Sequence, residues 1–270
     1  MLSDQHLKVV RYWQKSDNVF PNVDIKGGVA ITYRDSGVNF GAIGSFTTFP
    51  ELNTILHKVL SVEGDKPMLD SIVSPRGHFR FSVKAFSDHP EIPKTIGAGT
   101  GNMIASNAFD KLPSLFHRER PAKGDYVEMI GRDGKERVSR FMRRDYLEEN
   151  EYLGVYKVFV PEANGTGAIG EILSTPMLGE PMIGSTDTFI SVGRFSASCE
   201  AENCMGYIKT RFARTMLGIL KATQHNPRST WRYVPLQDFS KPWTDKELYK
   251  KYKLSDAEIK FIESMIKPMV

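Results

Sequence analysis

Apolar residues recur along this chain with two periods, one typical of helices and one typical of strands. Between residues 50 and 63 they recur every three or four positions, which predicts a helix with one buried face. A second helical pattern begins at Ser198, a residue that can cap a helix, and continues to Ile219. Two capping boxes, Thr244–Glu247 and Ser255–Glu258, predict two short helices near the C-terminus. The apolar face of the second pattern comprises Ala201, Cys204, Met205, Ile208, Phe212, Met216 and Ile219.

β-Branched and aromatic stretches predict strands in the first two thirds of the chain. A turn at residues 132–135 joins two of them into a hairpin. The glycine-rich residues 91–110 predict a loop, and residues 143–149 predict a short helix. The first pair of strands has no following strand–helix–strand pattern to pair with, so it predicts a hairpin that is not a complete domain. The predicted strands are residues 7–13, 29–33, 79–83, 126–130, 137–141, 152–160 and 183–195.

Composition places the chain among ordinary globular proteins. It has 270 residues, 40% of them hydrophobic, and a formal net charge of +4. Its two cysteines, Cys199 and Cys204, exclude a disulfide scaffold and cannot supply the usual four ligands of zinc. No apolar run approaches the roughly 20 residues of a membrane span, and the N-terminus lacks the features of a signal peptide. We therefore expect a cytoplasmic protein with no membrane contact.

Charge is distributed unevenly along the chain. Residues 205–232 contain six basic residues and no acidic ones, and residues 111–144 contain ten basic and five acidic ones. Residues 145–204, between them, contain two basic and ten acidic residues. If the fold gathers the basic segments, the surface attracts polyanions. The alternative is that the opposite signs neutralise each other in the folded chain.

The acid-free segment contains the strongest candidates for binding. At 100° per residue, Arg211, Arg214 and Lys221 fall on a face that the apolar residues do not occupy, which predicts a solvent-facing basic stripe. The loop that follows, residues 224–230, offers side chains suited to phosphates and base edges. The alternative is a solvated helix face with a polar loop. The predicted DNA-binding residues are Arg76, Lys157, Lys209, Arg211, Arg214, Lys221, His225 and Arg228.

Motifs for independent catalysis are weak. Gly97–Gly101 resembles a phosphate-binding loop but lacks the preceding buried strand and the following helix. Asp24 and Lys26 match half of a metal-dependent nuclease site, for which Asp17 is the nearby second carboxylate. The six histidines show no pairing at metal-ligand spacing. A nuclease that uses Asp17, Asp24 and Lys26 is therefore kept as an alternative function.

Six short segments, taken together in their order along the chain, resemble the C-terminal part of adenine-N6 DNA methyltransferases from type II restriction–modification systems. That family includes restriction enzymes in which the methyltransferase is fused to a nuclease. The resemblance extends over nearly the whole chain. The segments are Val19–Val29, Tyr156–Pro161, Ser185–Phe189, Tyr207–Arg214, Val234–Phe239 and Trp243–Tyr249.

This resemblance implies a division into parts. Residues 1–40 would supply the last strands of a methyltransferase sheet, residues 41–235 a β-rich target-recognition domain, and residues 236–270 a C-terminal helical tail. The family's glycine-containing loop for S-adenosylmethionine and its Asn-Pro-Pro-Tyr motif do not occur here, because the only Asn-Pro pair, at 226–227, is followed by Arg228. The family also places Asp24 and Lys26 in a structural turn.

The implied function is recognition of a DNA sequence, with no catalytic residue and no cofactor of its own. S-adenosylmethionine, and Mg²⁺ where a nuclease is fused, would act in the parent enzyme. The implied partners are double-stranded DNA and a methyltransferase half or subunit that contains the missing motifs. A truncated remnant that folds without binding is the third interpretation that the sequence leaves open.

Overall fold

The computed structural model describes residues 1–13, 16–22, 29–47, 49–134, 136–164, 172–221 and 223–269. The strands are β1 (Leu7–Trp13), β2 (Val29–Arg34), β3 (Tyr126–Asp133), β4 (Glu136–Arg143), β5 (Tyr156–Pro161), β6 (Met177–Gly179), β7 (Ile183–Ser185) and β8 (Phe189–Phe195).

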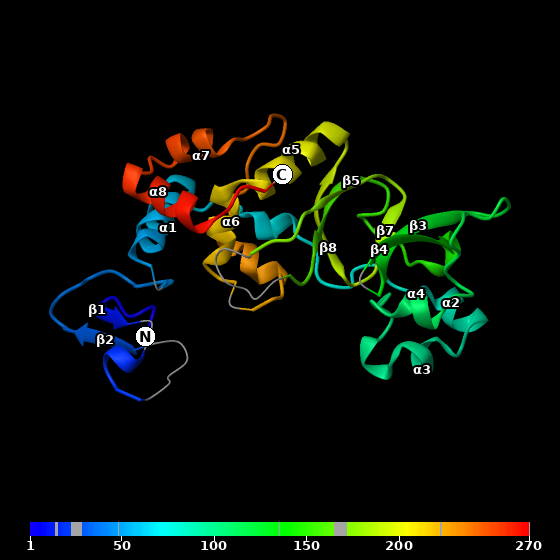
Figure 1. Cartoon of the computed structure of the whole chain (residues 1–270), viewed down its shortest axis with the longest axis horizontal. Helices are drawn as coiled ribbons and strands as arrows, with labels where there is room; N and C mark the ends of the chain where they lie inside the picture. Colours follow the sequence, from blue (N-terminus) through cyan, green and yellow to red (C-terminus); the bar gives the residue numbers. More distant parts are fainter. Residues whose placement is uncertain are drawn as a thin grey trace.

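The helices lie before, between and after these strands, so the fold is mixed α/β, as predicted. The α-helices are α1 (Pro50–Glu63), α2 (Val83–Asp88), α3 (Ile92–Ile96), α4 (Ala108–Lys111), α5 (Ser198–Lys209), α6 (Arg211–Gly218), α7 (Asp245–Lys251) and α8 (Asp256–Met265). The 3₁₀ turns are η1 (Ser16–Asn18), η2 (Leu69–Ile72), η3 (Ala98–Thr100), η4 (Arg144–Tyr146) and η5 (Arg228–Tyr233). The chain extends along one long axis, with α1, α7, α8 and the β1–β2 hairpin toward one end and β3, β4 and helices α2–α4 toward the other (Figure 1). None of the described helices has the length and apolarity to cross a bilayer.

Three small sheets are formed by the described strands. β1 and β2 pair antiparallel, with a bulge between Val9 and Arg11. β3 pairs antiparallel with β4 on one side and parallel with β7 on the other. β5 lies between β6 and β8 and is antiparallel to both. The sheets are too small to form a layered methyltransferase-type sheet among themselves.

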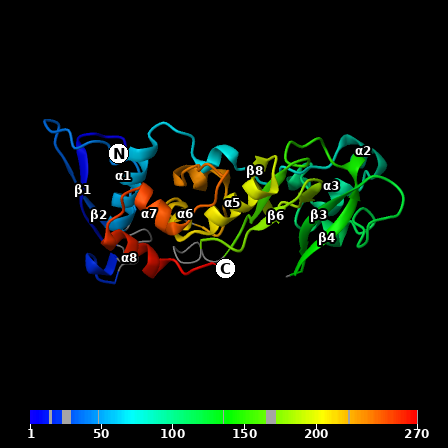
Figure 2. The ribbon, with the colours of Figure 1, turned by 90° about the horizontal axis from the view of Figure 1, so that it is seen from above.

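The apolar residues form two cores, one on each side of the β5–β8 pair. The helical lobe consists of α1, η2, α5, α6, η5, α7 and α8, and its core includes Val158 of β5 and Val192 of β8. The β lobe consists of α2, α3, α4, β3, β4 and β7, and its core includes Phe159 and Phe189. Because successive side chains of a strand point to opposite faces, β5 and β8 contribute to both cores. Figure 2 shows the two lobes along the axis with this sheet between them.

The predicted helix over residues 198–219 is interrupted at Thr210. Thr210 has ψ 149°, and its hydroxyl accepts a hydrogen bond from the amide of Ala213 at 3.1 Å. The carboxylate of Asp245, in α7, accepts hydrogen bonds from the amides of Arg211 (3.2 Å) and Phe212 (2.9 Å). These contacts end α5 and begin α6 in a new direction. The helical phase predicted across the break is therefore wrong.

Other predicted elements have mixed outcomes. The helix over residues 50–63, the two hairpins and both C-terminal capping boxes are confirmed. Residues 79–83 do not form a strand, because Arg80 and Phe81 make only isolated bridges and Ser82 caps α2. The loop predicted at 91–110 contains α3 and α4, and its apolar residues fill the β-lobe core. The helix predicted at 143–149 is limited to the single turn η4.

The C-terminal residues pack into the helical lobe. The Tyr252 hydroxyl donates a hydrogen bond to Glu63 of α1 at 2.6 Å, and its ring stacks on Phe212 of α6 with centroids 4.9 Å apart. Glu258 of α8 accepts hydrogen bonds from Lys58 (2.6 Å) and Thr54 (2.8 Å) of α1. These contacts link segments about 200 residues apart in sequence and join α7 and α8 to α1.

The N-terminal hairpin is mostly exposed. Its apolar residues Val10, Ile31 and Tyr33 are 58%, 49% and 47% exposed. Of the described residues before position 41, only Leu7 and Ser16 are buried. A two-stranded hairpin of this kind is at best marginally stable on its own.

Candidate functional site

Three of the predicted DNA-binding residues are buried, which contradicts the predicted solvent-facing stripe. Arg214 and Lys221 are 5% and 4% exposed, and Lys157 is fully buried. The Arg214 guanidinium donates to the carbonyls of Lys209 (3.1 Å) and Lys267 (2.7 Å). It therefore satisfies carbonyls at the end of α5 and holds the C-terminal tail.

The two buried lysines have the same kind of partner. The Lys157 ammonium donates to the carbonyls of Val155 (3.1 Å) and Glu180 (2.8 Å). The Lys221 ammonium donates to the carbonyl of Ile172 (2.8 Å) and to the side chain of Asn164. Burial lowers the pKa of Lys157 to about 7 and that of Lys221 to about 8. These three cations stabilise the backbone instead of facing solvent.

Three other predicted residues lie closer to the surface. Arg211 is partly buried and pairs with Glu263 of α8 at 3.3 Å, and Lys209 is partly buried near the end of α5. Arg228 is exposed and donates to the carbonyl of Asp70 at 2.7 Å. The break at Thr210 and the covering tail explain why no continuous basic stripe forms.

The remaining two predicted residues, Arg76 and His225, lie together at a cleft between the helical lobe and the β lobe. The cleft has a volume of about 410 Å³, within the range of small-molecule pockets. We call it the inter-lobe cleft. It is lined by Arg76, Ser106, Arg132, Arg137, Pro161, Glu162, Ala163, Ser174, Asp187, Thr188, Phe189 and His225.

Two nearly buried carboxylates organise the basic side chains of this cleft. The side chains of Asp187 and Glu162 are each 7% exposed. The Arg76 guanidinium donates a hydrogen bond to Asp187 at 2.8 Å and lies 3.9 Å from the Glu162 carboxylate. Nδ1 of His225 lies 2.9 Å from the same Glu162. A carboxylate only accepts hydrogen bonds, so Nδ1 of His225 carries the proton. The side chains of Arg76 and His225 are 49% and 45% exposed and remain accessible from solvent.

Backbone contacts fix Arg76 from both sides. The amide of Ser74 donates to the carbonyl of Ser191 (2.8 Å), and the Ser74 hydroxyl accepts from the amide of Ser191 (2.8 Å). Gly77 has φ 62°, and a Cβ at this position would lie 2.2 Å from Sδ of Met103. The turn that carries Arg76 therefore requires glycine after it.

The loop that carries His225 is fixed by its neighbours. The amide of Asn226 donates to the Glu162 carbonyl at 2.7 Å, and its buried side chain donates to the Pro161 carbonyl at 3.2 Å. Lys221 also donates to the carbonyl of Gln224 at 3.2 Å. Lys221, predicted as a DNA contact, thus lies behind His225 and orders its loop.

Two arginines of the β3–β4 hairpin complete the basic lining. Arg132 and Arg137 are directly opposite each other in the pairing of β3 and β4, and both are exposed. The Arg137 guanidinium lies over the Phe189 ring, 5.6 Å from its centroid, and donates to the Thr175 carbonyl at 3.2 Å. Burial and the charge of Arg132 lower the pKa of Arg137.

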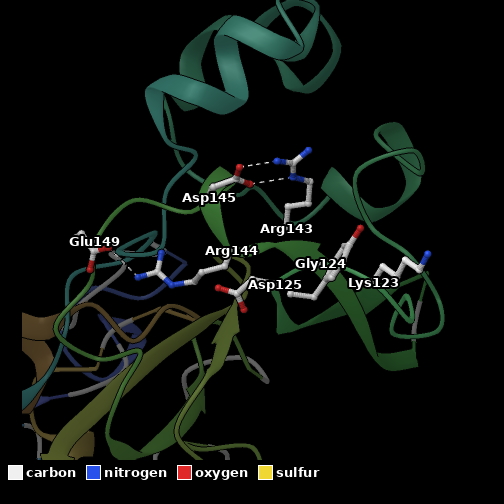
Figure 3. A pocket seen from close by; sticks show the side chains of 8 residues that line it. Lys123, Gly124, Asp125, Arg143, Arg144, Asp145 and Glu149 are labelled. Atoms are coloured by element: carbon white, nitrogen blue, oxygen red, sulfur yellow. Dashed lines mark hydrogen bonds and ion pairs between the residues drawn. The ribbon is translucent and has the colours of Figure 1, made fainter.

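A second depression lies on the β lobe, and its charges are balanced. It has a volume of about 790 Å³ and is shown in Figure 3. We call it the surface hollow. Arg143 pairs with Asp145 at 2.6 Å, and Arg144 pairs with Glu149 at 2.9 Å. The hollow is lined by Lys123, Gly124, Asp125, Tyr126, Arg143, Arg144, Asp145 and Glu149.

The sequence did not single out Arg132, Arg137, Glu162 and Asp187. Arg132 and Arg137 belong to the basic segment 111–144 and flank its predicted turn, which was a usable signal. Glu162 and Asp187 stood out only as members of the acidic segment. Their role depends on contacts between residues 111 positions apart, such as that of Arg76 with Asp187.

The nuclease alternative gains no geometric evidence. Asp24 and Lys26 lie outside the described residues, and Asp17 is exposed in the turn η1. Within the described part of the chain, no group of three His, Cys, Asp or Glu residues is placed to hold a metal ion. Gly97–Gly101 overlaps the short turn η3 and precedes no long helix. Cys204 is buried in the helical lobe, and Cys199 is exposed.

Comparison with models of known protein families, with curated proteins and with solved structures gives no significant match.

Proposed function

We propose that this chain recognises double-stranded DNA through the inter-lobe cleft, as the target-recognition part of a restriction–modification adenine-N6 methyltransferase. The observation that carries the proposal is the gathering of Arg76, Arg132, Arg137 and His225 around one accessible cleft. They come from segments of the chain that are far apart in sequence. Arginine is well suited to this task because its planar guanidinium can donate to phosphates and to base edges.

The buried carboxylates support this proposal. Asp187 and Glu162 restrict the orientation of Arg76, and Glu162 also restricts His225. A side chain that is already ordered loses less conformational entropy when it binds. The surface hollow lacks this arrangement, because its ion pairs are exposed and its charges cancel.

The N-terminal hairpin supports the proposed partner. Among the described strands, β1 and β2 pair only with each other, and this pairing and their exposed apolar residues suit addition to a sheet of another polypeptide. We assign that role to the methyltransferase half, which would bind S-adenosylmethionine and hold the flipped adenine. This chain would contribute recognition and no catalytic group, and Mg²⁺ would be needed only where a nuclease is fused to the parent enzyme.

The test is a titration of the full chain with fluorescent mixed-sequence duplex DNA at several salt concentrations. We expect binding that weakens with salt, because each phosphate contact releases counterions. Arg137→Ala should lower the slope of log K against log salt by about one. Arg143→Ala, in the surface hollow, is the matched control and should leave the slope unchanged.

Two results would contradict the proposal. One is binding of DNA that is equally weakened by Arg137→Ala and Arg143→Ala, which would indicate non-specific attraction. The other is the absence of binding both by the chain alone and in the presence of a supplied methyltransferase half.

A further inference from the structure

We infer that Arg76 recognises a guanine of the target site, while Arg137 contacts the phosphate backbone. This inference rests on the proposed function and divides the inter-lobe cleft into two parts. The division follows from the different surroundings of Arg76 and Arg137.

Arg76 is poorly suited to a phosphate. Its single positive charge lies beside two nearly buried carboxylates, Asp187 at 2.8 Å and Glu162 at 3.9 Å. A phosphate placed against this group would meet a local excess of negative charge in surroundings that screen it weakly. A neutral hydrogen-bond acceptor meets no such repulsion.

Arg76 retains donors for a neutral acceptor. Guanidinium has five N–H donors in a fixed plane, and the contacts with Asp187 and Glu162 orient that plane. In the major groove, guanine presents two acceptors, O6 and N7, which match two N–H groups of one arginine. Adenine replaces one acceptor with a donor, which an arginine cannot match. Guanine is therefore the base that an arginine fixed in this way selects.

Arg137 has the opposite surroundings. It lies opposite Arg132 in the pairing of β3 and β4, so the residue that faces it across the hairpin is a second cation. The contacts of Arg137 with the Phe189 ring and the Thr175 carbonyl do not neutralise its charge. An anion beside the Arg137 guanidinium would supply the opposite charge. A backbone phosphate of the same DNA supplies that charge.

The experiment is a selection from a randomised duplex pool, with the full chain immobilised and the bound DNA sequenced. The parent chain should enrich a motif that contains at least one guanine. A double variant, Arg76→Gln with Asp187→Asn, replaces this ion pair by two neutral polar side chains and leaves neither charge without its partner. It should lose at least about fivefold of the enrichment for guanine at one position and keep the rest of the motif.

Two further variants separate the roles. Arg76→Lys keeps the charge beside the carboxylates but loses the planar pair of donors, so its guanine enrichment should also fall. Arg137→Ala should keep the whole motif and weaken binding to all sequences alike. Thermal unfolding of each variant shows that a change in motif does not arise from loss of the fold.

The outcomes distinguish this inference from the proposed function. If the parent enriches a motif and both Arg76 variants keep its guanines, the inference is overturned and the proposed function stands. If the parent enriches no DNA, with or without a supplied methyltransferase half, the proposed function fails and the inference fails with it. Loss of a guanine by Arg137→Ala, with Arg76→Lys unchanged, would reverse the assignment of the two roles.

Discussion

The helical segment 205–232 and the inter-lobe cleft use basic residues in opposite ways. In the segment, Arg214 and Lys221 are buried and donate to backbone carbonyls. In the cleft, Arg76 and Arg137 keep access to solvent although carboxylates or an aromatic ring lie beside them. The local net charge of the sequence had favoured residues 205–232 as the DNA-binding surface. The contrast shows that the groups in contact with a basic side chain, and not the net charge of its sequence segment, decide whether that side chain stabilises the fold or stays accessible to a ligand.

The largest effect on stability is expected from Arg214→Ala. The change leaves carbonyls of Lys209 and Lys267 without their donor and opens a cavity at the junction of α5, α6 and the tail. We expect the free energy of unfolding to fall by about 2–4 kcal/mol. Urea unfolding measures this loss, and Arg232→Ala, at an exposed position, is the control. A change below about 0.5 kcal/mol would show that Arg214 does not hold the fold.

The second effect concerns pH and the buried Lys157. Its pKa is about 7 in the folded chain, against 10.5 for an exposed lysine. Between these pH values the unfolded chain binds more protons, so the free energy of unfolding should rise with pH. The contribution is at most about 1.4 kcal/mol per pH unit. The free-energy cost of burying the charged ammonium is present in full below pH 7 and is absent above pH 10.5.

Lys157→Met tests this sign. Urea unfolding between pH 7 and pH 10 should show a smaller rise with pH than the parent shows. Part of the rise should remain, because Lys221 has a pKa of about 8 and contributes in the same direction. Identical slopes for parent and variant would mean that Lys157 stays charged in its buried position.

Local signals in the sequence were sufficient for the elements that depend on neighbouring residues. The helix at 50–63, the hairpin formed by β3 and β4 and the capping boxes of α7 and α8 are of this kind. The break at Thr210 was missed because Asp245, which caps α6, lies more than 30 residues away. Residues 79–83 alternate like a strand because Phe79 and Phe81 are buried, but within the described chain Arg80 and Phe81 form only isolated bridges.

The candidate site was predictable only in part. Arg76 and His225 were among the predicted residues, and the structure brings them together on Glu162. Their carboxylate partners were hidden because acidic residues were counted as a segment with one net charge. Burial of Glu162 and Asp187 depends on how β5, β8 and the loop at 224–226 meet, and no local pattern encodes that arrangement.

The third effect tests the cleft against the helical segment. Arg137→Glu reverses the charge at the cleft and removes the contacts of Arg137 with the Phe189 ring and the Thr175 carbonyl. Because the position is exposed, we expect the free energy of unfolding to change by less than about 1 kcal/mol and DNA affinity to fall by at least about tenfold. Arg214→Ala should do the reverse, with lower stability and unchanged affinity of the folded protein. If both variants lose affinity equally, the contrast between the two regions is wrong.

The smallest effect is expected from deletion of residues 1–40. In the described part of this stretch only Leu7 and Ser16 are buried, so its removal takes little apolar area from either core. The described contacts that the deletion removes include the ring contact of Tyr12 with Phe46, whose centroids are 5.3 Å apart. They also include the hydrogen bond from the amide of Gly44 to the carbonyl of Leu2 at 2.9 Å. The free energy of unfolding should change by less than about 1 kcal/mol, and DNA affinity by less than about twofold.

This deletion also separates recognition from assembly. If the hairpin adds to the sheet of a methyltransferase half, the shortened chain should still bind DNA but should no longer associate with that half. Size-exclusion chromatography of the mixed proteins measures association, and the full chain is the control. Loss of cooperative unfolding on deletion would show instead that residues 1–40 are needed by the two lobes. The exposure of Val10, Ile31 and Tyr33 would then require an explanation other than a partner strand.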